Sequence, residues 1–289
     1  MAAGFVRANG VSFAVQQSGP RDAPLALLVH GFPDTPSTWR HLTPLLVGAG
    51  YRVAAPWLRG YAPSEVPADR TVEPDTLAAD LNALHRALGG DRDAVLVGHD
   101  WGAIAAARAA AAAPQRWRRL ATLAVPPERV LARHLGPTQL WRSRYLVAAQ
   151  LPGAEQRMLH PASVAALWRR WSPGYVPSDE DLEPVAACFR SPGVPRAVLA
   201  YYRGFRRAAA AGRALSERVP LPPQPHLVLH GRDDGCIGAE VADATVGRLP
   251  HPASEVVVLD GVGHFLHLEA PDEVGARIVA HLGAAKGGA

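Results

Sequence analysis

The sequence has very little cysteine and almost no lysine. Among its 289 residues are two cysteines, Cys188 and Cys236, and one lysine, Lys286. Two scattered cysteines are too few for a disulfide framework or a zinc site. We therefore expect a reduced, cytoplasmic protein that holds no metal.

A long hydrophobic segment is also missing. No apolar run approaches the roughly 20 residues that cross a bilayer, and Met1–Gly10 lacks the basic-then-apolar pattern of a secretory signal. The net charge is +4 and the pI about 9.4, but the arginines are spread along the chain and form no basic tail. These absences argue against a membrane or a nucleic acid as partner.

What the sequence does contain is a strand–helix alternation in its first part. Near-continuous apolar runs suit a parallel sheet that is covered on both faces. Leucines at helical spacing follow Asp75 and Thr76, and indicate a helix between two such runs. The pattern predicts an α/β fold with a mostly parallel, doubly wound sheet. The expected strands of this part are Leu25–His30, Arg52–Ala55, Ala94–Gly98 and Leu120–Val125.

From Gly136 to Pro220 the strand pattern disappears. Helical patterns punctuated by prolines replace it, over Gln139–Gln150, Ser163–Trp171, Asp179–Arg190 and Arg196–Leu215. Strands then resume at His226–His230 and Glu255–Leu259, and Pro271–Leu282 is the expected final helix. We predict a core of residues 1–135 and 221–289, interrupted by a helical cap subdomain of residues 136–220.

A tight strand-to-helix turn with a carboxylate at its tip lies within Val95–Ala103. A β-run ends at Gly98, and an apolar helix begins at Trp101. Gly98 and Gly102 permit a turn that is too tight for larger side chains. Asp100 stands where esterases of this kind carry serine. A carboxylate attacks without deprotonation and suits strained or good-leaving-group electrophiles at saturated carbon, so Asp100 is predicted to form an ester; the simpler interpretation is a helix N-cap.

The loop His30–Pro33, which follows the first parallel strand, is the expected oxyanion loop. In such a fold this loop supplies one backbone N–H, and the residue after the nucleophile supplies a second. The candidate donors are therefore the backbone N–H groups of Phe32 and Trp101.

Near the end of the chain, a histidine follows a strand in a Gly-x-Gly-His segment. This residue, His264, lies just after Glu255–Leu259 and is the expected general base. His251 and His267 are rivals, but neither has this strand–glycine context.

The acid that orients the base is expected after the preceding strand. There the sequence offers two adjacent candidates, Asp233 and Asp234, in the segment Gly231-Arg-Asp-Asp234 that follows His226–His230. Glu128, which follows Leu120–Val125, is a remote alternative.

Taken together, these residues resemble the α/β-hydrolase-fold epoxide hydrolases, with haloalkane and haloacetate dehalogenases as close relatives. The resemblance covers nearly the whole chain, and its motifs are specific to the branch that uses an aspartate nucleophile. It implies Asp234 rather than Asp233 as the acid, and no metal or organic cofactor. The matching motifs are His30-Gly-Phe-Pro, Leu58-Arg-Gly-Tyr61, Gly98-His-Asp-Trp-Gly102, Gly231-Arg-Asp-Asp234 and Gly263-His264.

The resemblance also implies two tyrosines in the cap that face the epoxide oxygen. Tyr145 precedes Gln150–Gly153 at the matching distance, and Tyr202 lies on the last expected cap helix, with Tyr201 as the fallback. Phenol hydroxyls are donors at neutral pH and can give a proton to a developing alkoxide. The simpler interpretation of each tyrosine is ordinary packing.

The implied activity is the opening of an epoxide to a vicinal diol through an Asp100 ester, which water activated by His264 and Asp234 then hydrolyses. A haloalkane dehalogenase is the alternative, because Trp101 stands where those enzymes bind halide. Against it, Phe32 occupies a position where many of them have asparagine; a haloacetate enzyme would carry arginine in place of Trp101. A ligand-binding protein without catalysis is a remote alternative.

One departure from the family pattern is Trp57, which stands where relatives usually have aspartate, and we interpret it as local repacking. The small residues Ala148 and Ala149 stand where relatives often have aromatic ones, which favours a wider pocket. The expected partners are a small epoxide and water, and a homodimer is compatible with the sequence.

Overall fold

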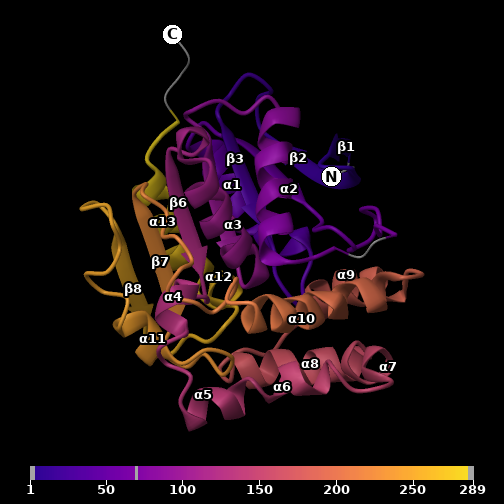
Figure 1. The fold of residues 1–289 in the computed structure, drawn as a ribbon. Helices are drawn as coiled ribbons and strands as arrows, with labels where there is room; N and C mark the ends of the chain where they lie inside the picture. The colour runs from indigo at the N-terminus through magenta and orange to yellow at the C-terminus, as the bar shows by residue number, and fades with distance from the viewer. Residues whose placement is uncertain (1–3, 69–70, 286–289) are drawn as a thin grey trace.

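The computed structural model describes residues 4–68 and 71–285 (Figure 1). Its centre is an eight-stranded sheet in the order β1-β2-β4-β3-β5-β6-β7-β8. From β4 across to β8 all neighbouring strands are parallel, whereas β1 pairs with β2, and β2 with β4, in antiparallel fashion. The predicted α/β fold with a mostly parallel sheet is therefore confirmed. The strands are β1 (Gly4–Ala8), β2 (Val11–Ser18), β3 (Leu25–Val29), β4 (Arg52–Pro56), β5 (Val95–His99), β6 (Arg119–Leu123), β7 (His226–Gly231) and β8 (Glu255–Leu259).

Helices cover both faces of the sheet, which is why its central strands are apolar at nearly every position. Leu27 and Leu96 point to one face, where they pack in a core shared with α2 (Pro74–Ala87) and α3 (Trp101–Ala112). Leu28 and Val97 point to the other face. The helices there are α1 (Leu42–Gly48) and α13 (Pro271–Leu282), with α12 (Leu266–Glu269) beside them. Helix α11 (Ala239–Asp243) packs against β7 and β8, and its Val241 belongs to the core of the first face.

The first two strands form a hairpin that is not among the expected strands. β1 lies at the edge of the sheet, and Phe5 is 64% exposed. A strand that is buried on one side only, or not at all, lacks the continuous apolar run by which the central strands are recognised. The missed hairpin extends the sheet away from the candidate site.

Seven helices separate β6 from β7, and most of them form a layer beneath the sheet in Figure 1. The layer contacts the carboxyl ends of the strands: Trp168 Nε1 donates to the carbonyl of Pro33, and the Tyr201 hydroxyl donates to the carbonyl of Arg59. The helices are α4 (Glu128–Leu131), α5 (Pro137–Arg142), α6 (Arg144–Ala148), α7 (Ala154–Met158), α8 (Pro161–Trp171), α9 (Asp179–Arg190) and α10 (Val194–Ala210).

The helix expected over Gln139–Gln150 is divided in two. The break between α5 and α6 lies at Ser143, whose ψ of 7° departs from helical geometry. The helix expected over Arg196–Leu215 runs instead from Val194 to Ala210. The division of the chain into core and cap at residues 136 and 220 stays a prediction. Within the described part of the chain, no helix is both long and apolar enough to span a bilayer.

Candidate active site

Asp100 occupies a strained turn between β5 and α3. Its φ of 52° and ψ of −117° are unusual for a residue other than glycine. Two glycines make the turn possible: a Cβ on Gly98 would lie 2.2 Å from the carbonyl oxygen of Gly102, and a Cβ on Gly102 would lie 2.0 Å from that of Val29. The turn holds the Asp100 carboxylate at the positive end of α3. An N-cap bond from the side chain is absent, so capping does not explain this residue.

The loop after β3 holds one oxygen of this carboxylate. The backbone N–H of Phe32 donates to Asp100 Oδ1 at 2.7 Å. The approach is so close that a Cβ on Gly31 would lie 2.5 Å from the same oxygen. Trp101, the second predicted donor, is the first residue of α3. Asp100 Oδ1 is thus placed where an oxyanion would form if Asp100 became an ester.

His264 stands between two carboxylates. Its Nδ1 lies 2.8 Å from Asp234 Oδ2, and its Nε2 lies 3.6 Å from Asp100 Oδ2. The other oxygen of Asp234 accepts backbone N–H bonds from Cys236 at 2.6 Å and Ile237 at 3.0 Å. The structure therefore brings together the three residues predicted as nucleophile, base and acid, and leaves His264 Nε2 facing the nucleophile.

The neighbouring carboxylates determine the protonation state of His264. Burial alone would lower the pKa of His264, but Asp234 and Asp100 outweigh it and raise that pKa to about 10. Burial would raise the pKa of Asp234; His264 and the backbone N–H bonds outweigh it, so that this pKa is lowered. At neutral pH the resting site thus contains an imidazolium held between carboxylates.

This raised pKa predicts a pH-dependent contribution to stability. His264 ionises with a pKa of 6.5 when unperturbed and about 10 in the fold. Its ion pairs therefore stabilise the fold fully below pH 6.5, and the contribution is lost as the pH rises towards 10. We expect the difference in unfolding free energy between the wild type and His264→Gln to shrink over this interval. Urea unfolding of both proteins at the two pH values measures it; a constant difference would contradict the assigned charge state.

The C-terminal end of α8 helps to hold the acid and base loops in place. The carbonyl of Trp171 accepts the backbone N–H groups of both Gly235 and His264, each at 3.0 Å. Glu269 accepts from the Ser172 hydroxyl at 2.6 Å and from the Gly263 N–H at 2.9 Å. Sequence reasoning missed these supports, because a backbone acceptor such as the Trp171 carbonyl leaves no residue-type signal, and Ser172 and Glu269 lie far apart in the chain.

The two predicted tyrosines lie side by side above the nucleophile turn. The ring of Tyr202 is 5.1 Å from that of Phe32, 5.5 Å from that of Trp101 and 5.5 Å from that of Tyr145. Among the described residues, the buried Tyr202 hydroxyl has no hydrogen-bond partner. The Tyr145 hydroxyl has only the Cys236 thiol, at 3.5 Å. Both hydroxyls are thus available to a ligand.

Burial dominates the acidity of these phenols. It raises the pKa of Tyr145 and of Tyr202 well above the ordinary value, and the nearby Asp100 carboxylate raises both further. Both side chains are therefore neutral donors at physiological pH.

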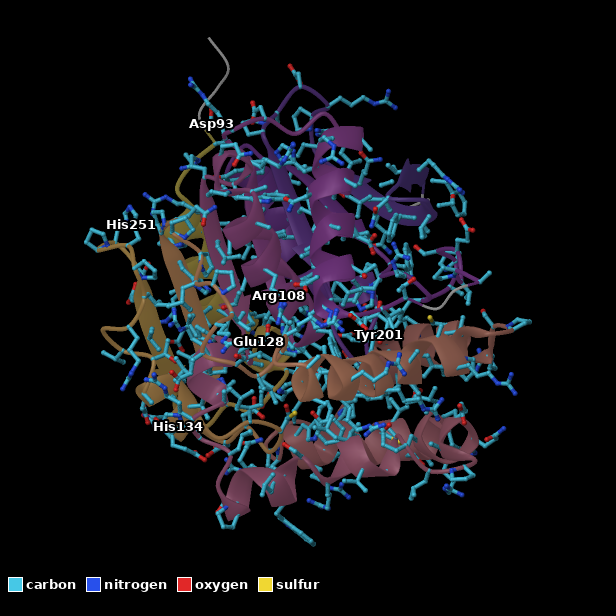
Figure 2. All side chains as sticks on the ribbon, in the orientation of Figure 1. Asp93, Arg108, Glu128, His134, Tyr201 and His251 are labelled. Atoms are coloured by element: carbon cyan, nitrogen blue, oxygen red, sulfur yellow. The ribbon has the colours of Figure 1, made fainter. Side chains whose placement is uncertain are left out.

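The fallback residue, Tyr201, points elsewhere. Its hydroxyl donates to the carbonyl of Arg59 at 2.7 Å, and its ring packs on Tyr61. Figure 2 shows Tyr201 on the side of α10 that faces the core. Its hydroxyl is already engaged in joining α10 to the loop after β4.

The alternative acids are placed where they cannot orient His264. Asp233 is exposed. Glu128 forms an ion pair with Arg108, with Nε to Oε2 at 2.7 Å and Nη2 to Oε1 at 3.0 Å, and Figure 2 shows the two side by side. Neither residue bonds to His264, whereas Asp234 does.

The rival histidines also lie apart from the nucleophile. His251 is on the loop before β8, at the far edge of the molecule (Figure 2). His267 is buried against Trp39 and bonds to the Thr38 hydroxyl. His99, which sequence reasoning did not single out, donates from Nε2 to the carbonyl of His264 at 3.0 Å and so supports the base from behind.

Two buried groups of three side chains are candidate metal sites. In each group, the three atoms that could bind a metal lie within 4.8 Å of one another. In the first, Asp234 and His264 are bonded to each other, and burial holds the Cys236 thiol in its protonated form by raising its pKa well above the ordinary value. The second contains Asp34, His99 and His267. Burial raises the pKa of Asp34 to about 7 and lowers that of His99 to about 3, so this group has little net charge near neutral pH. We assign a metal to neither group.

Comparison with known proteins agrees with this geometry. Residues 24–271 match the α/β hydrolase fold family. The sequence is 29% identical to the AB hydrolase superfamily protein YfhM of Bacillus subtilis and 33% identical to epoxide hydrolase A of Mycobacterium tuberculosis, in each case over 96% of both chains. The crystal structure of epoxide hydrolase A from Mycobacterium thermoresistibile has a TM-score of 0.77 and 27% identity, over 99% of both chains.

The chain therefore belongs to the α/β-hydrolase-fold family and is an enzyme of that superfamily. Its predicted resemblance to the epoxide hydrolases of this family is confirmed.

Proposed function

We propose that this enzyme hydrolyses epoxides to vicinal diols through an ester on Asp100. The observation that carries the proposal is the pairing of a carboxylate nucleophile, 3.6 Å from a histidine base, with two phenol hydroxyls packed above it. Among the described residues, that of Tyr202 has no hydrogen-bond partner and that of Tyr145 has only a thiol at 3.5 Å. A serine esterase needs no such phenols, whereas an epoxide oxygen needs a proton as its ring opens. Similarity to proteins named epoxide hydrolase supports the same activity.

In the first step, Asp100 Oδ2 attacks a ring carbon and the C–O bond to the epoxide oxygen breaks. Tyr145 and Tyr202 hydrogen-bond to that oxygen and pass it a proton. The ester has no negative charge, so one of the causes that raises the pKa of His264 disappears. The histidine then gives up its proton, which restores the tyrosine, and becomes a neutral base.

In the second step, His264 Nε2 takes a proton from water as the water oxygen attacks the carbonyl carbon of Asp100. The oxyanion forms at Oδ1, where the Phe32 N–H already donates, with the Trp101 N–H as the second donor. Collapse breaks the C–O bond between the Asp100 carbonyl carbon and the alkyl oxygen, and that oxygen takes the second proton of the attacking water, so that the neutral diol leaves. Asp100 is again a carboxylate beside an imidazolium held by Asp234, so protons and charges balance over the cycle.

We further propose that the helical layer of residues 136–220 acts as a cap over this site. It supplies both tyrosines and leaves Asp100 only 6% exposed. A water-poor site strengthens the electrostatic interactions on which ester formation depends. A cytoplasmic location and a homodimer stay predictions.

The experiment that tests the proposal is intact-protein mass spectrometry of His264→Gln after mixing with an aryl epoxide and, separately, with a bromoalkane. Without the base, the ester should accumulate. We expect a mass increase equal to the whole epoxide, located on Asp100 by peptide mapping. His251→Gln, which changes a histidine far from the site, should show no adduct because it still turns over.

The experiment with the bromoalkane distinguishes epoxide opening from dehalogenation, both of which would form an ester on Asp100. An adduct from the bromoalkane alone, short by the mass of HBr, would make the enzyme a dehalogenase. No adduct from either reagent would refute Asp100 as the nucleophile for both.

A further inference from the structure

A pocket of about 710 Å³ opens between α6, α7 and α8 in the helical layer. This volume lies within the range of small-molecule sites. Tyr145 forms part of its wall, and the Tyr145 ring also contacts Trp171 and Tyr202 at 5.0 and 5.5 Å. The pocket and the proposed active site therefore share one side chain.

The wall of this pocket is largely apolar and partly open to solvent. Val147 and Leu151 are 66% and 49% exposed, and Met158 and Leu167 lie beside them. Neighbouring apolar side chains left exposed in this way favour contact with an apolar ligand, because each Å² removed from water contributes about 25 cal/mol.

Three arginines line the same pocket, and no acidic side chain does. Arg144 donates to the carbonyl of Trp141 and lies 4.3 Å above its ring, and Arg157 donates to the carbonyl of Pro152. No hydrogen bond is formed by the Arg170 side chain to any described residue, and none of the three guanidinium groups pairs with a described carboxylate. The pocket therefore combines an apolar wall with uncompensated positive charge.

Asp100 and His264 are almost inaccessible from outside, at 6% and 0% exposure. The ring of Tyr145, which lines the pocket, lies 5.5 Å from that of Tyr202, so the pocket adjoins the tyrosine pair above the nucleophile turn. An ionised group is costly to bury without a partner, so it would stay at the arginines while the apolar part enters. Guanidinium groups bind carboxylates and phosphates through paired N–H bonds.

We propose that this pocket admits amphiphilic epoxides: an apolar chain that carries the epoxide and ends in an anionic headgroup, held by Arg144, Arg157 and Arg170. This substrate class rests on the proposed function. The anion-binding part of the proposal can be tested without any epoxide.

The first test is calorimetric binding of dodecanoate, dodecyl phosphate and dodecan-1-ol to the full-length protein. Both anions should bind about tenfold more tightly than the alcohol, and the tighter of the two identifies the headgroup. The double variant Arg157→Gln plus Arg170→Gln should remove this advantage. Arg144 is kept, because it also stacks on Trp141.

The matched control is Arg169→Gln, which changes an exposed arginine next to Arg170 that does not line the pocket. It should bind the anions as the wild type does. Equal binding of the anions and the alcohol, or an equal loss in the control, would overturn the proposal.

The second test compares the hydrolysis of a long-chain epoxy acid with that of its methyl ester. The double variant should raise KM about tenfold for the acid and leave KM for the ester unchanged, with kcat unaffected for both. If both are hydrolysed with the same KM in every variant, this inference fails and the proposed function stands. If neither is hydrolysed although dodecanoate binding depends on the arginines, the proposed function fails and the anion site stands.

Discussion

Asp100→Ala is expected to lower kcat/KM for epoxide hydrolysis by a factor on the order of 10⁴ to 10⁶. The substitution removes the atom that attacks the ring, and no other carboxylate lies in its place: Asp234 is occupied by His264 and two backbone N–H groups. Steady-state kinetics on an aryl epoxide, with circular dichroism to verify folding, measures the effect.

The matched control for this prediction is Asp233→Ala. Asp233 is an aspartate of similar sequence context to Asp234 but is exposed. Its replacement should leave kcat/KM within about twofold, as for most surface substitutions. Residual activity above about 1% in folded Asp100→Ala would mean that water attacks the epoxide directly and that no ester forms.

The second large effect is expected from Tyr145→Phe combined with Tyr202→Phe. Phenylalanine keeps the ring packing against Trp171 and Phe32 but removes both proton donors. General acid catalysis contributes about 10²- to 10⁴-fold, so the double variant should lose that much in kcat/KM. Each single variant should lose less, because the other hydroxyl remains. The loss should lie in ester formation, which single-turnover mixing resolves.

Tyr201→Phe is the control for the tyrosine pair. It removes a hydrogen bond to the carbonyl of Arg59, so it should reduce stability by about 1 kcal/mol and change kcat/KM by less than about threefold. A larger loss of activity in Tyr201→Phe than in Tyr202→Phe would reverse the assignment. An active double variant would remove both tyrosines from the mechanism.

The proposed cycle depends on one imidazole that changes its charge between steps. In the resting site, Asp100 and Asp234 together hold His264 as a cation. Esterification removes the charge of Asp100, and only then does the histidine become a base. The same residue can therefore supply a proton when the ring opens and accept one when water attacks.

Some features of this protein are determined by the sequence alone because they are local. Gly98, Asp100 and Gly102 are close neighbours, and the strained backbone at Asp100 follows from a turn in which neither glycine has room for a Cβ. The apolar central strands are equally visible, because burial on both faces leaves few polar positions. The α/β class and the candidate nucleophile could thus be predicted from neighbouring residues.

The acid that orients His264 cannot be identified from the local sequence pattern alone. Asp233 and Asp234 are adjacent, and the sequence favoured Asp234 only through its resemblance to a family. In the structure the carboxylate of Asp234 turns inward to His264, 30 residues further along the chain, while that of Asp233 is exposed. The packing of the loop after β7 against the loop after β8 decides between them.

Only the tertiary structure distinguishes Tyr201 from Tyr202. Both side chains of α10 are buried, at 0% and 3% exposure, so amphipathic spacing assigns both to the inner face. Adjacent helical residues point about 100° apart, since a turn takes 3.6 residues. One therefore reaches the carbonyl of Arg59, and the other reaches the nucleophile turn. The rotation of α10 about its axis is set by long-range packing, and no local pattern in the sequence encodes it.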